Sequence, residues 1–132
     1  MNELELIKIA KLAAENAYIP YSGFTVGAAL LTKDGKIYSG CNIENASYSP
    51  TNCAERTAFF KAVSEGERDF TAIAIVGGKD RNFTDYCSPC GVCRQVMAEF
   101  CNKDFKIILG RNDDYKTFTL GELLPENFSL KE

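Results

Sequence analysis

Apolar side chains recur about every three to four residues along the start of the chain. They stand at Leu4, Leu6, Ile7, Ile9, Ala10, Ala13, Ala14 and Ala17. This period places them on one face of a helix, so the pattern predicts an amphipathic helix over residues 3–17. The segment Ile19–Gly23 contains proline and glycine, which predict the end of this helix.

Denser apolar runs follow, and they predict strands. Residues Phe24–Thr32 are rich in strand-forming side chains. The Asp34-Gly35 pair behind them is a strong hairpin signal, which predicts a returning strand over 36–41. Shorter runs predict strands over 72–76, ended by Gly77-Gly78, over 107–109 and over 116–119.

Two further helices are predicted from their start signals. Thr51 or Asn52 can cap a helix over 53–65, because a short polar side chain accepts hydrogen bonds from the free N–H groups of a helix start. Ser88 at the N-cap and Pro89 at the first helical position predict another helix over about 89–101.

The order of these elements indicates an α/β fold. A polar loop over 42–52 and a helical turn over 120–124 complete the series. Helix, hairpin, helix, strand, helix and strand in succession predict a mixed sheet with helices on its faces. With 132 residues and no linker, repeat or low-complexity tract, we expect a single domain over 1–132.

Charge and composition argue against two kinds of partner. The formal net charge is −3, and no cluster of lysine and arginine offers a basic field, so we expect no nucleic acid polymer. No apolar run approaches the roughly 20 residues that span a bilayer, so we expect no membrane. The segment Met1–Glu5 is acidic and lacks the basic start of a signal peptide, so we expect a cytoplasmic protein.

The chain contains six cysteines and no histidine. Thiols stay reduced in the cytosol, so this number of cysteines indicates metal binding or catalysis rather than disulfides. The absence of histidine removes the commonest general base and the commonest metal ligand. Any catalysis must therefore depend on carboxylates, thiolates or a metal.

Three cysteines stand at the starts of the two predicted helices. Cys53 precedes Ala54-Glu55, and Cys90 and Cys93 follow Pro89 about one helical turn apart. Helix N-termini favour thiolate, so the three sulfurs can hold one metal ion. Three protein ligands leave one position of a tetrahedral Zn²⁺ open to water, as in catalytic zinc sites.

Two charged residues beside Cys53 suit such a site. Glu55 follows Cys53 by two positions and can move protons without binding the metal. Zinc with three thiolates carries a net negative charge, which an arginine can offset by donating to the sulfurs. Arg56 is the preferred donor, and Arg94 is a second candidate.

Cys87 leaves one alternative open. Together with Cys90 and Cys93 it forms C-x-x-C-x-x-C, and with Cys53 it could complete a closed four-cysteine zinc or iron–sulfur site. Its place before the predicted helix start argues against this reading. Cys41 and Cys101 lack such partners and are interpreted as buried small apolar residues.

The pattern C-A-E followed by P-C-x-x-C matches the signature of the zinc deaminases, in which an all-cysteine ligand set is one variant. More specifically, the chain resembles the small homotetrameric cytidine deaminases. The similarity runs nearly end to end, through Tyr21–Leu30, Gly40–Tyr48, both cysteine segments, Leu123–Pro125 and Phe128.

The resemblance implies a three-layer α/β/α sandwich with a five-stranded mixed sheet, and one zinc ion per subunit held by Cys53, Cys90 and Cys93. It implies Glu55 as the acid–base group. Its implied substrate contacts are Asn42 and Glu44 on the ribose hydroxyls, Phe24 stacked on the base, and the Ala54 backbone on the polar edge of the base. Tyr48 and Phe128 are implied to complete the site of a neighbouring subunit in a homotetramer.

The function that the resemblance implies is pyrimidine salvage. Cytidine and 2′-deoxycytidine would be hydrolysed to uridine and 2′-deoxyuridine, with release of ammonia. Two alternatives remain at this point: a deaminase of a blasticidin-type cytosine nucleoside antibiotic, and a structural four-cysteine module that binds a protein partner. Asn42 and Glu44 favour an ordinary sugar over the antibiotic, which lacks the ribose diol.

Overall fold

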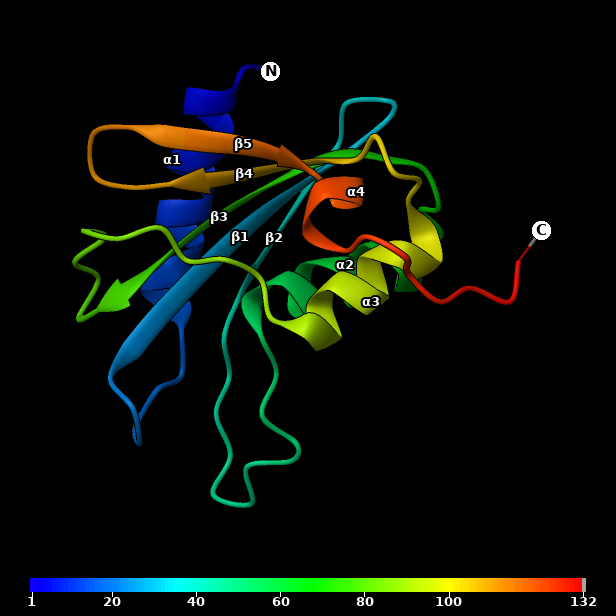
Figure 1. Cartoon of the computed structure of the whole chain (residues 1–132). Helices are drawn as coiled ribbons and strands as arrows, with labels where there is room; N and C mark the ends of the chain where they lie inside the picture. The colour runs from blue at the N-terminus through cyan, green and yellow to red at the C-terminus, as the bar shows by residue number, and fades with distance from the viewer. Residues whose placement is uncertain (132) are drawn as a thin grey trace.

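The computed structural model describes residues 1–131 and contains one five-stranded sheet (Figure 1). Its strands stand in the order β2-β1-β3-β4-β5. The strands are β1 (Phe24–Thr32), β2 (Ile37–Cys41), β3 (Phe70–Lys79), β4 (Lys106–Gly110) and β5 (Tyr115–Thr119). Strands β3 and β4 pair in parallel and the other neighbours pair antiparallel, so the sheet is mixed.

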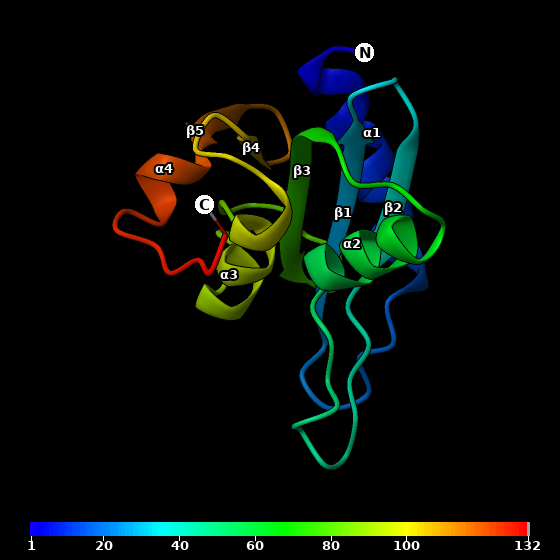
Figure 2. The ribbon, with the colours of Figure 1, turned by 90° about the vertical axis from the view of Figure 1, so that its right-hand side faces the viewer.

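The helices form a layer on each face of this sheet (Figures 1 and 2). Helix α1 lies on one face, and helices α2 and α3 lie on the other. The helices are α1 (Glu3–Ala13), the 3₁₀ turn η1 (Ala14–Asn16), α2 (Ala54–Ser64), α3 (Gly91–Phe100) and α4 (Leu120–Leu123). The predicted three-layer α/β/α sandwich is confirmed.

Alternation along the central strand β3 divides the core in two. Ala74 and Val76 pack in the cluster beneath α1, whereas Ile73 and Ile75 pack in the cluster beneath α2 and α3. Successive side chains of a strand point to opposite faces, and here both faces are covered. A continuous apolar run therefore forms this strand.

Gly40 lets α2 lie very close to the sheet. A Cβ atom at Gly40 would lie 2.5 Å from the carbonyl oxygen of Ala54 and 2.6 Å from the backbone nitrogen of Ala58. Only a glycine permits that approach. The first turn of α2, which carries Glu55, is thereby held against β2.

The starts of α2 and α3 differ from the sequence prediction. Each helix begins one residue after a cysteine, and Cys53 and Cys90 occupy the N-caps instead of Asn52 and Ser88. The sulfur of Cys90 accepts a hydrogen bond from the backbone N–H of Cys93, which is the task that a polar oxygen usually performs. Pro89 therefore precedes α3 rather than opening it.

Two other predicted ends also move. Strand β3 continues through Gly77 and Gly78, which pair with β1, and does not end there. At Gly78 a Cβ atom would lie 1.9 Å from the carbonyl oxygen of Asn82, so this glycine lets the turn after β3 fold back against the strand. The first helix ends at Ala13 and tightens into η1.

Within residues 1–131, no helix combines the length and apolarity that crossing a membrane requires.

Candidate active site

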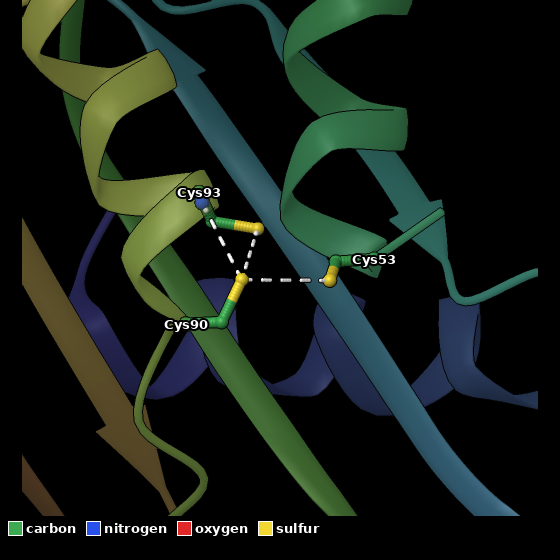
Figure 3. A group of neighbouring side chains, drawn as sticks. All are labelled: Cys53, Cys90 and Cys93. Carbon is green, nitrogen blue, oxygen red and sulfur yellow. Dashed lines mark hydrogen bonds between the residues drawn. The ribbon is translucent and has the colours of Figure 1, made fainter. Parts of the chain in front are cut away.

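The sulfurs of Cys53, Cys90 and Cys93 meet where the N-termini of α2 and α3 converge (Figure 3). The Sγ atoms of Cys53 and Cys90 are 3.8 Å apart, and those of Cys90 and Cys93 are 3.5 Å apart. All three lie within 4.8 Å of one another. Tetrahedral zinc with Zn–S bonds of about 2.3 Å requires sulfurs about 3.8 Å apart, so the cluster is suited to zinc.

The surroundings of Cys53 favour its thiolate. Hydrogen bonds from Cys93 and Arg56 lower the pKa of Cys53 to about 5, against the opposing effect of burial. The bond to Cys53 in turn raises the pKa of Cys93, because Cys93 supplies the proton. A metal ligand must be deprotonated, and the site already stabilises one of the three charges.

Arg56 donates a hydrogen bond from Nη2 to the sulfur of Cys53 at 3.2 Å. Its Nε is buried without a hydrogen-bond partner. A half-buried cationic side chain with a buried, unpaired donor is costly unless negative charge lies close by. The donor set therefore fits a cluster of thiolates around a metal.

Arg94 has a different task from the one considered in the sequence. Its Nε donates to the carbonyl oxygen of Pro89 at 2.8 Å, and Nη1 donates to that of Leu123 at 2.6 Å. Its Nη2 donates to Oγ of Ser88 at 2.8 Å. Arg94 thus fixes the segment before Cys90 to the end of α4.

Glu55 is a buried carboxylate in the first turn of α2, with only 4% of its surface exposed. Burial raises the pKa of Glu55 to about 7, and the negative charge of the nearby Cys53 thiolate contributes to this increase. A carboxyl group that exchanges its proton near neutral pH suits general acid–base catalysis.

Cys87 lies outside the sulfur cluster. Among residues 1–131, the group that could hold a metal here contains Cys53, Cys90 and Cys93 alone. The Cys87 side chain lies against Gly77, where an added Cβ would be 2.6 Å from its sulfur. Burial raises the pKa of Cys87 to about 12. A four-cysteine site is not present in this arrangement.

Asn42 bonds to the first residues of β1. Its Oδ1 accepts from the backbone nitrogen of Val26 at 3.0 Å, and its Nδ2 donates to the carbonyl oxygen of Phe24 at 2.8 Å. An asparagine side chain has four hydrogen-bonding positions. One acceptor and one donor position therefore remain for a ligand.

Glu44 organises the turn that leads into β1. Its Oε1 accepts from the backbone nitrogens of Tyr21 and Ser22 at 3.0 and 3.2 Å, and its Oε2 accepts from the hydroxyl of Ser22. The Ser22 hydroxyl has the largest effect in lowering the pKa of Glu44, which is thus ionised at neutral pH. Sequence reasoning missed Ser22, for which Pro20 and Gly23 gave only a turn signal.

The expected base contacts lie on two different elements. Phe24 is exposed at the start of β1 and lines a cleft with Gly77, Gly78 and Tyr86. Ala54 is fully buried as the first residue of α2, between Cys53 and Glu55.

Tyr48 and Phe128 are prominent exposed aromatic residues, with 76% and 67% of their surfaces accessible. Tyr48 has a φ of 59° on the loop over 42–52, which extends beyond the end of the sheet (Figure 1), and it lines a cavity together with Glu44. Phe128 follows α4, and its carbonyl oxygen accepts from Nε2 of Gln95 on α3 at 2.9 Å.

The fold and the sulfur cluster together define a zinc-binding deaminase. A sequence model described as the cytidine and deoxycytidylate deaminase zinc-binding region matches residues 1–109, and the chain belongs to this family.

Individual relatives match over the full chain. A protein named cytidine deaminase from Sporosarcina psychrophila is 53% identical across 100% of this chain and 95% of that protein. One of the same name from Halalkalibacterium halodurans is 55% identical across 100% and 98%. The crystal structure of cytidine deaminase from Burkholderia pseudomallei has a TM-score of 0.90 at 48% identity, covering 97% of this chain and 100% of that one.

Proposed function

We propose that residues 1–132 form one zinc-dependent cytidine deaminase domain for pyrimidine salvage. Cytidine and 2′-deoxycytidine are its substrates, and uridine or 2′-deoxyuridine and ammonia are its products. The observation that carries this proposal is the buried Glu55 beside three convergent cysteine sulfurs, in a chain similar along its whole length to named cytidine deaminases.

Cys53, Cys90 and Cys93 hold one zinc ion per subunit. When bound, the ion supplies a Lewis acid whose open fourth position makes water a nucleophile at neutral pH. Arg56 donates to the sulfur of Cys53 and offsets the excess negative charge of three thiolates.

Glu55 moves the protons. Its carboxylate takes one proton from the attacking water and delivers it to N3 of the cytosine ring, while a C4–O bond forms. It then takes the second water proton and delivers it to the C4 amino group, so that the C4–N bond breaks and ammonia leaves. Stabilisation of the tetrahedral species between these steps supplies most of the acceleration.

The segment around β1 binds the nucleoside. The free donor and acceptor positions of Asn42 and the free lone pair of Glu44 bind the ribose hydroxyls, because both side chains are already held in place by backbone groups. Phe24 stacks on the pyrimidine, and the Ala54 backbone meets its polar edge. No base flipping is required for a free nucleoside.

The active form is a homotetramer in which subunits share their sites. Tyr48 and Phe128 enter the site of a neighbouring subunit, and their exposure in the single chain supports this role. The six free cysteines suit a reducing compartment, so the enzyme acts in the cytosol.

The Glu55→Gln variant tests the proposal, with metal analysis and turnover measured on the same sample. We expect one zinc per chain and a native fold, with turnover on cytidine and 2′-deoxycytidine reduced by about 10³-fold or more, because the proton carrier is lost. Retained turnover would remove Glu55 from the mechanism. Loss of zinc from the variant would show that Glu55 has a structural role. In the parent protein, faster turnover of blasticidin S than of cytidine would assign the antibiotic as the substrate.

A further inference from the structure

The segment between β3 and α3 ends at the zinc-site residue Cys90 and carries an additional thiol at Cys87. The Cys87 side chain fills the space beside Gly77. A Cβ atom added to Gly77 would lie 2.6 Å from the Cys87 sulfur and 3.2 Å from the ring of Phe24. Its spacing to Cys90 and Cys93 is that of a zinc-ligating run, and its burial is only partial. The fold must therefore hold this thiol away from the metal.

An anchor precedes Cys87 at Tyr86. The Tyr86 hydroxyl donates to Oδ2 of Asp114 at 3.1 Å. The guanidinium of Arg111 lies 4.1 Å from the Tyr86 ring centroid and holds Asp114 through two hydrogen bonds of 2.7 Å. The Lys116 ammonium lies 4.7 Å from the same centroid. Tyr86 is thus fastened to the β4–β5 hairpin by a hydrogen bond and two cation–π contacts.

A second anchor follows Cys87. Arg94 on α3 donates to Ser88 and to the carbonyl oxygen of Pro89. Cys87 therefore lies between two fastened residues, Tyr86 on one side and Ser88 on the other. Neither anchor includes a proposed metal ligand or the proton carrier Glu55, and Tyr86 lines the same cleft as Phe24.

We propose that Tyr86 is a positioning residue of the zinc site. By fastening the β3–α3 segment to Asp114, it holds Cys87 against Gly77 and keeps the metal at three thiolate ligands. Thiolates bind zinc strongly, and a fourth would close the position that catalysis requires. The inference rests on the proposed three-thiolate deaminase site and adds the device that preserves its open position.

Cobalt substitution of the full chain provides the test. Co²⁺ occupies tetrahedral thiolate sites, and its sulfur-to-metal charge-transfer absorption grows with each Co–S bond. In the Tyr86→Ala variant we expect this absorption to rise by about a third, as three thiolates become four. We expect kcat of the zinc form to fall by roughly tenfold with zinc content unchanged, because the open position is closed.

The double variant Tyr86→Ala/Cys87→Ala decides whether Cys87 causes the loss. We expect it to restore both the parent absorption and most of the parent kcat, and Cys87→Ala alone to match the parent. Tyr38→Ala is the matched control, because Tyr38 also donates a hydrogen bond to a carboxylate, that of Glu67, at 3.2 Å. The same carboxylate forms an ion pair with Lys36 at 3.3 Å. We expect parent absorption and kcat for this control.

Three results would overturn the inference. They are an unchanged spectrum and kcat in Tyr86→Ala, a loss that the double variant does not restore, and an equal loss in the Tyr38→Ala control. Should Tyr86→Ala fail to fold, the Asp114→Asn variant replaces it. Asp114 is exposed, its loss of charge weakens the same anchor, and the same changes in cobalt absorption and kcat are expected. A parent protein with four-thiolate absorption and no turnover would instead refute the proposed function.

Discussion

Arg56 is the charged residue in direct contact with the cysteine cluster. Its Nη2 donates to Cys53, and its Nε is buried with no acceptor of its own. Because three thiolates exceed the charge of Zn²⁺ by one, a neighbouring cation restores the electron-withdrawing power of the metal. The effect of Arg56 is therefore expected on turnover rather than on metal retention.

Substitution of Arg56 by alanine tests this charge balance. We expect Arg56→Ala to lower kcat by about tenfold, equal to about 1.4 kcal/mol of transition-state stabilisation. Zinc content should stay at one per chain, measured by atomic absorption after gel filtration. Arg68→Ala is the control, because Arg68 is exposed beyond the end of α2 and donates to backbone carbonyls. Parent turnover in Arg56→Ala would refute the charge argument.

Helix α2 follows Cys53 and carries Glu55, and its packing depends on an aromatic cluster around its middle. Phe59 is fully buried, with ring centroids 5.1 Å from Phe70 and 6.0 Å from Phe105. Phe60, the next residue, is 49% exposed. Two neighbouring phenylalanines thus occupy opposite environments on one helix.

This contrast gives a matched pair of variants. We expect Phe59→Ala to lower the free energy of unfolding by about 3–5 kcal/mol, because it leaves a cavity in the core. Phe60→Ala should lower it by less than about 1 kcal/mol, as for most exposed positions. Urea titrations followed by circular dichroism measure both. Equal losses in the two variants would contradict this packing of α2.

The elements also show what the sequence could and could not predict. Apolar runs, the Asp34-Gly35 hairpin signal and helix start signals were enough to predict the strands and the three longer helices, because burial on both faces gives central strands such as β3 a continuous apolar pattern. The caps were mispredicted, because a cysteine sulfur accepts the hydrogen bond at α3 where Ser88 was expected. The contacts of Ser22 with Glu44 and of Tyr86 with Asp114 join segments more than twenty residues apart, which local patterns do not report.

At the scale of the whole molecule, the metal would link two helices that lie on the same face of the sheet. Cys53 is the N-cap of α2, Cys90 is the N-cap of α3, and Cys93 lies in the first turn of α3 (Figure 3). A ligand that binds only the folded chain stabilises that chain by mass action. The zinc site is therefore expected to contribute to stability as well as to catalysis.

Removal of the metal tests this contribution. We expect treatment with a strong chelator to abolish turnover and to lower the melting temperature by roughly 10 °C or more, because several kcal/mol of binding energy are lost. Differential scanning calorimetry with and without added Zn²⁺ measures the shift. The Glu55→Gln variant should show the same shift, since it keeps all three sulfurs. An unchanged melting temperature would contradict the structural part of the role.

The sulfurs of Cys53 and Cys90 come from positions 37 residues apart, and the whole of α2 and β3 lies between them. An ion held by both therefore closes a long loop, and closure requires that the two helix starts have already docked on the sheet. We therefore expect capture of the ion by all three sulfurs to come late in folding. Zinc binding is then expected to lower the unfolding rate constant and to leave the folding rate constant nearly unchanged, so the zinc-bound protein stays folded for longer.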